Sequence, residues 1–175
     1  MAKARIVLGG GCFWCIEAVF SDVKGVHSAI SSYAGGLRPN PSYENICTGA
    51  TGHAEVVDIS YDDEIISLNE LLDIFFVIHD PTTLNRQGAD QGTQYRSVIY
   101  YNSNEEKECI LTSIQQHQTF FEEKIVSEVS ELPEVYPAEA YHQNYYKQNP
   151  TQGYCQAVIR PKVQKFMTSF ADKLA

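Results

Sequence analysis

Gly9-Gly10-Gly11-Cys12-Phe13-Trp14-Cys15 is the stretch from which the organisation of this chain follows. An apolar run over residues 4–8 precedes it and reads as a β-strand, and an amphipathic helical pattern over residues 12–23 follows at once. The glycines form a flexible hinge, so we expect Cys12 at or near the start of a helix. Unpaired backbone N–H groups and the helix dipole favour an anion there, which predicts that the Cys12 thiol ionises readily.

The surroundings of Cys12 allow two interpretations. Trp14 is the only tryptophan of the chain and stands beside Phe13. A thiolate next to such an aromatic platform suggests a nucleophile that faces an apolar group of a substrate. Free cysteines are also common in protein cores, and a buried thiol at a strand–helix junction fits the same residues. The motif by itself leaves both interpretations open.

Length and charge narrow the class of protein. A chain of 175 residues with 43% hydrophobic residues suits one domain with its own core, and we expect residues 1–175 to form that single domain. A formal net charge of −9 argues against non-specific binding to nucleic acid or anionic membranes. No apolar run approaches the roughly 20 residues of a membrane helix. The N-terminal residues do not resemble a signal peptide, so we expect a cytoplasmic protein.

Cysteine usage points to chemistry rather than to a disulfide framework. The chain has five cysteines, and an odd number without a secretion signal does not predict structural disulfides. Cys155 lies in an irregular segment next to Gly153 and Tyr154, where the chain has the freedom to move that a second, resolving thiol needs. Cys47 and Cys109 are expected to be structural.

The order of predicted elements indicates an α+β fold. Strands and helices through residue 101 alternate as strand, helix, strand, strand, helix, strand, which is typical of a ferredoxin-like two-layer sandwich with helices on one face of the sheet. Serine–glutamate capping boxes at Ser67 and Ser103 predict the starts of two helices. We expect strands over 4–9, 26–34, 53–61, 96–101 and 125–131, helices over 12–23, 67–80 and 103–124, C-terminal helical additions over 138–148 and 160–173, and long loops over 35–52 and 80–94.

Glu55 is the most informative acidic residue. Strand alternation places it on the same face as Val57, Ile59 and Tyr61, so its carboxyl group is expected to be partly desolvated. Desolvation raises the pKa of a carboxyl group, which is what a general acid near neutral pH needs. The alternative is a carboxylate at the strand end that reaches solvent or pairs with an arginine.

Three further polar residues lie in or beside the long loops. Tyr43 belongs to the first loop and Tyr95 follows the second, and functional hydroxyl groups are often placed on loops. Asp90 stands in a turn-rich stretch, where a structural turn aspartate is the simpler interpretation. His79, ahead of Asp80 and Pro81, is expected to end a helix rather than to act as a base.

Together these residues resemble the peptide methionine sulfoxide reductases of the A type. The resemblance spans roughly residues 5–155, nearly the whole chain. It rests on long motifs in one order: Gly11-Cys12-Phe13-Trp14, Tyr43, Gly49-x-Thr51-Gly52-His53-Ala54-Glu55-Val56, His79-Asp80-Pro81-Thr82, Asp90-Gln91-Gly92-Thr93-Gln94-Tyr95-Arg96-Ser97 and Ala138-Glu139-x-Tyr141-His142-Gln143-x-Tyr145.

The resemblance implies a role for each candidate residue. Cys12 is the nucleophile that attacks the sulfur of methionine S-sulfoxide, and Glu55 is the acid that protonates the sulfoxide oxygen. Tyr43 and Tyr95 supply hydroxyl groups that bind the sulfoxide oxygen, and Asp90 is a carboxylate that organises the site. Phe13 and Trp14 form an aromatic wall for the substrate methyl group. Cys155 is the resolving thiol. Many members have glycine where this chain has Cys15. Cys15 is an alternative resolving thiol, because it lies three residues from Cys12 on the same helical face.

The same resemblance implies the partners. It predicts a single catalytic domain without cofactor or metal that repairs free or protein-bound methionine sulfoxide in the oxidative stress response. Thioredoxin is the expected reductant of the resulting disulfide, and we expect a monomer. A Gly-rich tail with a further cysteine, present in some longer members, is absent here.

Two other classes of protein share features with this sequence but fit it less well. The spacing of Cys12 and Cys15 also suits a thioredoxin-like dithiol oxidoreductase, but no proline lies between them and the expected strand order is wrong for that fold. A zinc-binding module would need a second pair of ligands with metal-binding spacing, and the sequence offers one Cys-x-x-Cys only.

Overall fold

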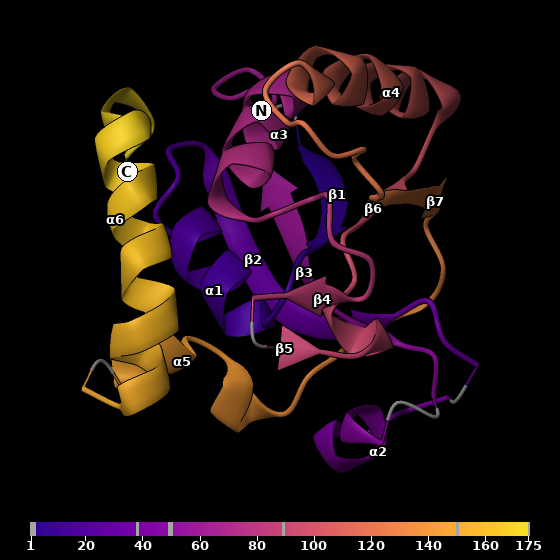
Figure 1. Ribbon diagram of the computed structural model, residues 1–175, viewed down its shortest axis with the longest axis vertical. Helices are drawn as coiled ribbons and strands as arrows, with labels where there is room; N and C mark the ends of the chain where they lie inside the picture. Colours follow the sequence, from indigo (N-terminus) through magenta and orange to yellow (C-terminus); the bar gives the residue numbers. More distant parts are fainter. Residues whose placement is uncertain (1–2, 38, 49–50, 89, 150, 175) are drawn as a thin grey trace.

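A mixed sheet in the order β7-β6-β1-β3-β2-β8 forms the centre of the molecule in this computed structural model (Figure 1). The described residues are 3–37, 39–48, 51–88, 90–149 and 151–174, so Gly49 of the motifs above lies outside them. Neighbouring strands are antiparallel except β6 and β7, which are parallel. The strands are β1 (Ala4–Gly9), β2 (Val26–Ala34), β3 (Ala54–Tyr61), β6 (Val98–Tyr101), β7 (Glu128–Glu131) and β8 (Val135–Pro137).

The four strands predicted before residue 101 are confirmed and occupy the middle of this sheet. β1 and β2 run in the same direction, with β3 between them and antiparallel to both, and β6 lies on the other side of β1. The α+β class is therefore confirmed. β7, which confirms the strand predicted over 125–131, forms one edge of the sheet, whereas the short strand β8 at the opposite edge was not predicted.

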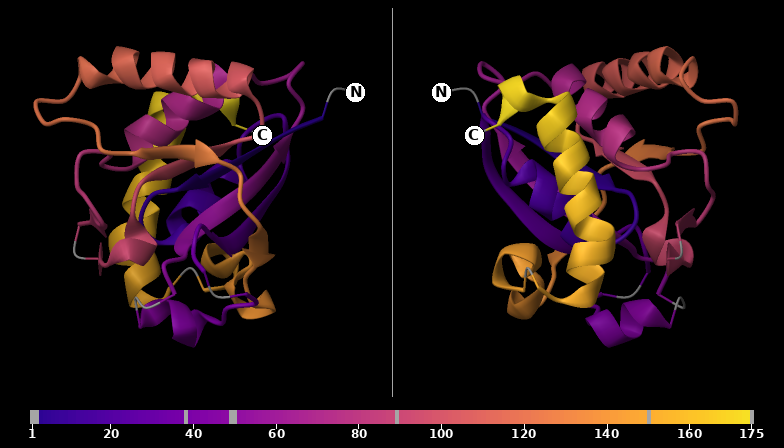
Figure 2. Two further views of the ribbon diagram at one scale, coloured as in Figure 1. Left: turned by 90° about the vertical axis from the view of Figure 1, so that its right-hand side faces the viewer. Right: turned by 60° about the vertical axis from the view of Figure 1, so that its left-hand side comes forward.

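Helices cover the sheet from one side and from the end of the molecule drawn uppermost. In Figure 1, α1 lies between α6 and the sheet, and α4 crosses above α3. Figure 2 shows these helices from two other directions. The smaller elements gather at the opposite end, which holds the candidate site. The helices are α1 (Phe13–Phe20), α2 (Tyr43–Cys47), α3 (Leu68–Ile78), α4 (Asn104–Gln118), α5 (Tyr145–Gln148) and α6 (Arg160–Ser169).

Local sequence signals explain where several helices begin. Ser67 and Glu70 form the predicted capping box at the start of α3. At α4 the box is incomplete, because the Ser103 hydroxyl accepts the N–H of Glu106 while the Glu106 carboxylate accepts the N–H of Asn102. α1 is shorter than predicted and ends at Phe20.

The two predicted loops and the C-terminal additions contain more structure than expected. α2 interrupts the first loop, and the second holds a small hairpin of β4 (Arg86–Gln87) and β5 (Asp90–Gln91), followed by a 3₁₀ turn over Thr93–Tyr95. The helix predicted over 138–148 is wrong. Left-handed Asn144 separates a 3₁₀ turn over Ala140–His142 from α5. A π-helical turn over Cys155–Ile159 leads into α6.

The main apolar core lies between the sheet and helices α1, α3 and α6. Ile6 and Leu8 of β1 and Val57 and Ile59 of β3 contribute to it and are fully buried. A second, smaller cluster on the other face of the sheet contains Val7, Ala34, Ala54, Val56, Val98 and Tyr100. None of the helices within the described ranges has the length and apolar character needed to cross a bilayer.

Candidate active site

Cys12 sits where the glycine hinge joins β1 to α1. It is the residue that caps the N-terminus of α1, as predicted. Gly11 has φ +87°, and a Cβ atom there would lie 2.9 Å from the Gln87 side chain, so this position accommodates only glycine readily. The Gly11 N–H donates to the carbonyl of Tyr95 at 3.2 Å, which brings the Thr93–Tyr95 turn to the cysteine.

The predicted ease of ionisation of Cys12 is wrong for this state of the protein. The side chain is 8% exposed. Burial raises the pKa of the Cys12 thiol well above its usual range, and the charges of Glu55 and Cys15 raise it further. The backbone N–H of Trp14 at the helix start lowers the pKa, as expected, and the Tyr154 hydroxyl also lowers it, but desolvation outweighs both.

Glu55 occupies the buried position that strand alternation predicted. It is 1% exposed, so the alternative of a solvent-reaching carboxylate is wrong. The Phe13 N–H donates to Glu55 Oε1 at 3.2 Å, and the Cys12 thiol is near enough to the same carboxyl group to affect its pKa. Burial raises the pKa of Glu55 to about 8, and the nearby charge of Asp90 adds to the shift. The site therefore pairs a buried thiol with a carboxyl group that is largely protonated at neutral pH.

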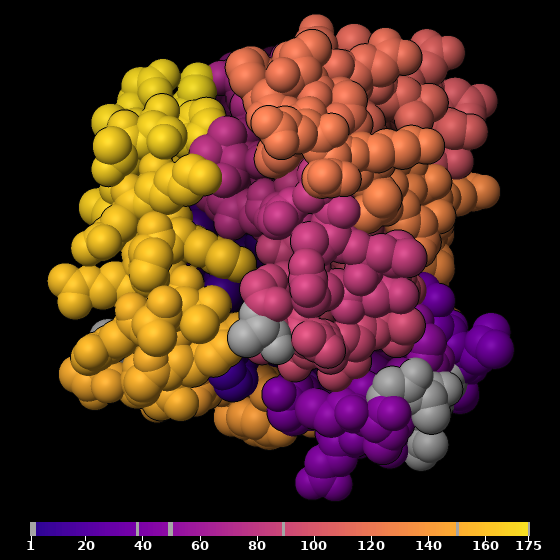
Figure 3. All heavy atoms as spheres, in the orientation of Figure 1, coloured from indigo at the N-terminus to yellow at the C-terminus, as the bar shows by residue number. Residues whose placement is uncertain are grey.

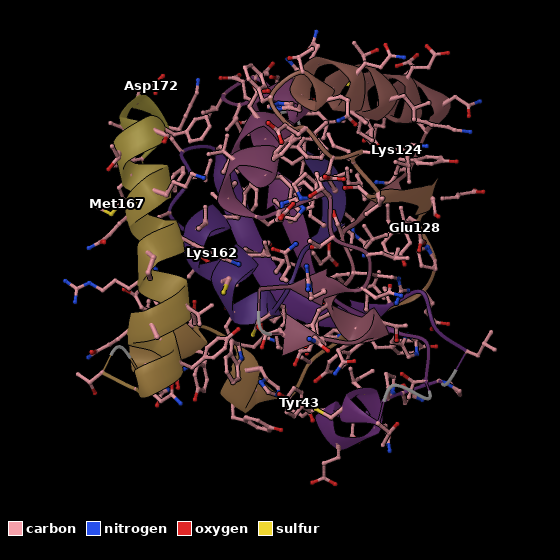
Figure 4. All side chains as sticks on the ribbon, in the orientation of Figure 1. Tyr43, Lys124, Glu128, Lys162, Met167 and Asp172 are labelled. Carbon is pink, nitrogen blue, oxygen red and sulfur yellow. The ribbon has the colours of Figure 1, made fainter. Side chains whose placement is uncertain are left out.

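Tyr95 and Tyr43 approach this pair from two separate segments. The charges of Glu55, Cys12 and Asp90 raise the pKa of Tyr95, after burial. Burial and Glu55 likewise raise the pKa of Tyr43, and Cys47 raises it further. Figure 4 shows Tyr43 at the start of α2, on the side that faces residues 138–142. Both phenols therefore remain protonated and able to donate hydrogen bonds.

The site also contains Tyr154, which the sequence reasoning did not identify. Its hydroxyl donates to Asp90 Oδ2 at 2.6 Å and is near enough to Cys12 and Cys15 to affect the pKa of both thiols. Asp90 is thus more than a turn residue, because it holds this hydroxyl near the two thiols. The only signal for Tyr154 in the sequence was its place next to Cys155.

The predicted aromatic pair is part of a larger aromatic group. Phe13 is fully buried, and its ring centroid lies 5.6 Å from that of Tyr33 and 5.2 Å from that of His142. Trp14 is partly buried and stacks on Tyr145, with ring centroids 3.7 Å apart and an angle of 7° between the planes. The edge of Tyr154 completes the group at 5.8 Å from Trp14.

His142 is a second residue that the sequence reasoning left without a role. Its Nδ1 accepts the indole N–H of Trp14 at 3.1 Å, and burial lowers its pKa. A neutral ring that accepts at Nδ1 must carry its proton on Nε2. That Nε2 atom is buried and has no hydrogen-bond partner among the residues that the structure describes. His142 therefore holds a donor within the aromatic group.

The five cysteines are all unpaired, and they differ in their relation to Cys12. Cys15, on the first turn of α1, is buried and interacts with the charge of Cys12; burial raises its pKa to about 11. Cys155 is also buried, at the first position of the π-helical turn, and burial alone raises its pKa. Cys47 lies exposed at the end of α2, and Cys109 is partly buried on α4; their structural role stays a prediction.

A cavity of about 740 Å³ lies behind the glycine hinge, between α3, the end of α4 and α6. Phe76, His79, Gln87 and Lys162 are among its lining residues. Figure 3 shows the furrow between the C-terminal segment and the middle of the chain, with atoms of the N-terminal segment at its floor. Lys162 points from α6 toward α1 (Figure 4), and its charge lowers the pKa of Cys15. His79 is a buried helix-end residue, as expected.

Comparison with known proteins places this site in a family. The family described as peptide methionine sulfoxide reductase matches residues 4–174. The chain belongs to the peptide methionine sulfoxide reductases. It is 56% identical to the peptide methionine sulfoxide reductase MsrA of Nitratiruptor sp. over 174 residues, which cover 99% of each chain. The thioredoxin-like and zinc-binding interpretations are therefore superseded.

Solved structures agree with this family assignment. The methionine sulfoxide reductase A of Corynebacterium diphtheriae matches with a TM-score of 0.79 and 35% identity, over 89% of this chain and 79% of that chain. Mxr1 from Saccharomyces cerevisiae in complex with Trx2 matches with a TM-score of 0.58 and 25% identity, over 82% of this chain and 85% of that chain. The reductase thus shares its architecture across distant relatives.

Proposed function

We propose that the enzyme reduces methionine S-sulfoxide to methionine with Cys12 as the nucleophile and Glu55 as the acid. The observation that carries this assignment is the burial of the Cys12 thiol beside a buried carboxyl group with which it interacts electrostatically and whose pKa is raised to about 8. A sulfoxide oxygen is a poor leaving group until it is protonated, and a protonated carboxyl beside the nucleophile supplies that proton.

The proposed reaction has three steps: reduction of the sulfoxide, formation of a disulfide and reduction of that disulfide. The Cys12 sulfur attacks the sulfur of the sulfoxide while Glu55 protonates the oxygen, which gives an intermediate with a new S–S bond and an S–OH group; Glu55 regains its proton from the Cys12 thiol. The hydroxyl group then passes to the Cys12 sulfur as the S–S bond breaks and leaves its electron pair on the sulfur of methionine. Methionine leaves, and Cys12, which supplied the two electrons, becomes a sulfenic acid. A second thiol then condenses with the sulfenic acid, forming a disulfide and releasing water. A dithiol reductant exchanges with that disulfide and restores both thiols.

Tyr43, Tyr95 and Asp90 support the first step. Both tyrosine hydroxyls keep their protons because burial and the charge of Glu55 raise their pKa values. Hydroxyl donors aimed at the sulfoxide oxygen stabilise the charge that develops on it. Asp90 holds the Tyr154 hydroxyl beside Cys12 and so orders the same region.

Phe13 and Trp14 form the wall against the substrate methyl group. A buried phenyl ring and a stacked indole offer an apolar surface that favours a methyl group over water. Such a wall recognises the end of the methionine side chain and not the neighbouring peptide sequence. The enzyme is therefore suited to free and protein-bound methionine S-sulfoxide alike.

We assign the resolving step to Cys155 rather than to Cys15. The π-helical turn that begins at Cys155 is a conformation often found at functional sites, and a Cβ atom built at Gly153 would meet nothing within 4 Å. This segment has room to bend toward Cys12. Cys15 is nearer in the sequence but is held in the first regular turn of α1, whereas Cys155 begins an irregular turn.

Cys155→Ser should separate the two steps of the reaction. The variant is expected to release about one methionine per enzyme and then stop turning over with thioredoxin, because its sulfenic acid has no resolving thiol. Cys15→Ser, the matched control, should turn over normally. Peptide mapping of oxidised wild-type enzyme should find a Cys12–Cys155 disulfide. A Cys12–Cys15 disulfide together with normal turnover of Cys155→Ser would reverse the assignment.

Thioredoxin is the proposed reductant, and the complex of the similar Mxr1 with Trx2 supports this choice. The antiparallel order β6-β1-β3-β2 supports a ferredoxin-like description of the core. We further propose a single catalytic domain that acts as a monomer in the cytoplasm. Turnover of each purified epimer of methionine sulfoxide with thioredoxin tests the activity: the S epimer should be reduced, and equal rates for both epimers would contradict the proposal.

A further inference from the structure

Glu17 is a buried carboxylate on the catalytic helix that the reaction above does not use. It lies one turn after Trp14 on α1 and is 2% exposed. Its two oxygens accept the backbone N–H of Asn144 at 2.8 and 2.9 Å. A hydrogen bond to an ionised acceptor is roughly twice as strong as a neutral one. Glu17 therefore ties α1 to a segment that is more than a hundred residues away in the sequence.

That segment carries the partners of Trp14. Asn144 lies between His142, which accepts the indole N–H, and Tyr145, which stacks on the indole ring. Asn144 has φ +55°, a left-handed conformation that turns the chain from the 3₁₀ turn into α5. Gln143 anchors the same turn to β2 through the backbone N–H and carbonyl of Ser31.

We propose that Glu17 is a positioning residue of the substrate site. Its carboxylate holds Asn144 so that His142 and Tyr145 close around Trp14 and fix the shape of the aromatic wall. This inference rests on the proposed role of Trp14 in substrate binding. Gln143 fixes the turn to the sheet, and Glu17 fixes its backbone to the helix that bears Trp14 and follows Cys12.

The charged groups around Glu17 give the tether a dependence on pH. Burial raises the pKa of Glu17 to about 7, against the effects of the Asn144 N–H, Ser31 of β2 and Lys147 of α5. Glu17 and His27 of β2 line one cavity of about 640 Å³, and Lys147 Nζ lies 3.6 Å from Asp22 Oδ1. Lys162 of α6 and Glu55 of β3 affect the pKa values of Cys15 and Cys12 at the start of α1.

The direction of this dependence follows from the two protonation states. Above about pH 7 Glu17 is ionised and makes the stronger, charge-assisted bond to Asn144. As the pH falls through that value, the carboxyl is protonated and the bond weakens. The aromatic wall should therefore loosen on the acidic side of neutrality.

Glu17→Gln tests the tether by kinetics. Glutamine keeps the shape but resembles the protonated acid, so the variant should raise KM for methionine S-sulfoxide about tenfold at pH 8 while kcat changes by less than about twofold. At pH 6 wild type and variant should have similar KM values. Wild type and variant both retain Cys12 and Glu55, so the ratio of their KM values at each pH reports the effect of Glu17. A ratio that is constant from pH 6 to pH 8 would show that Glu17 has only a structural role.

Fluorescence of Trp14, the only tryptophan, gives a readout that does not need turnover. Wild-type emission should change between pH 6 and pH 8, whereas Glu17→Gln should show the acidic spectrum throughout. Glu106→Gln, which removes a carboxylate from the backbone N–H of Asn102 just before α4, is the matched control. It should behave as wild type in fluorescence and KM.

The two readouts separate the possible failures. Identical titrations of emission in wild type and Glu17→Gln would overturn the tether itself. A changed emission with an unchanged KM would overturn its role in substrate binding, whether or not Cys12 is the nucleophile. If Glu17→Gln does not fold, the wild-type emission still decides, because a constant spectrum from pH 6 to pH 8 contradicts the tether.

Discussion

Cys12→Ser is expected to reduce the turnover of methionine S-sulfoxide to background. A serine hydroxyl does not ionise near neutral pH and forms neither a sulfenic acid nor a disulfide, so both the attack and the regeneration steps are lost. Methionine release by chromatography and the loss of thiols on oxidation measure the two steps separately. Wild type should lose two thiols per chain, and the variant none.

Cys109→Ser provides the matched control for that experiment. Cys109 lies on α4, is partly buried and has no part in the proposed reaction. Its replacement should leave turnover unchanged, because the remaining cysteines and the site are intact. Substantial methionine release by Cys12→Ser would remove Cys12 from the mechanism, whatever the control shows.

Glu55→Gln should slow reduction by about two to four orders of magnitude, the usual range for loss of a general acid. Glutamine keeps the size of the side chain and a hydrogen-bond donor but delivers no proton to the sulfoxide oxygen. Single-turnover release of methionine is the relevant measurement, because it is independent of recycling. An unchanged single-turnover rate would exclude Glu55 as the acid.

The same variant should make Cys12 more, not less, reactive toward an alkylating agent. The charge of Glu55 raises the pKa of the Cys12 thiol, so its removal lowers that pKa and populates the thiolate at lower pH. The rate of iodoacetamide labelling at Cys12, followed by peptide mass, should therefore reach its midpoint at a lower pH than in wild type. Faster labelling of Cys12 together with slower reduction of the sulfoxide would show that Glu55 acts by donating a proton and not by activating the thiol.

Asp58→Asn is the control carboxylate on the same strand. Asp58 lies on the other face of β3 and pairs with Arg5 at 2.7 Å, partly exposed to solvent. It should change neither the reduction rate nor the labelling profile by more than a small factor, since exposed ion pairs contribute little. A large effect of Asp58→Asn would mean that the consequences of Glu55→Gln are not specific to the site.

Local signals in the sequence predicted the elements whose cause is local. The hinge of glycines placed Cys12 at the start of α1, and alternation placed Glu55 on the buried face of β3. The Ser67 capping box marked the start of α3. Each of these predictions depended only on residues a few positions apart in the sequence, so none of them needed the tertiary contacts.

Predictions failed where the deciding contact came from far along the chain. The helix expected over 138–148 is broken because Glu17 and Ser31 hold residues 143 and 144. The ionisation of Cys12, judged from the helix start alone, has the wrong sign because burial and the Glu55 carboxylate outweigh the helix N–H groups. No pattern within either segment contained those partners.

The sequence by itself determined the α+β class, the central strands, the place of Cys12 and the family resemblance, since these follow from residue order and periodicity. Only the tertiary structure brought Asp90, Tyr154 and His142 to Cys12 and Trp14, from three separate segments. Their effects are electrostatic and depend on distances of a few ångströms and on exclusion of water. Such distances exist only once the sheet has assembled and the C-terminal segments have packed against α1.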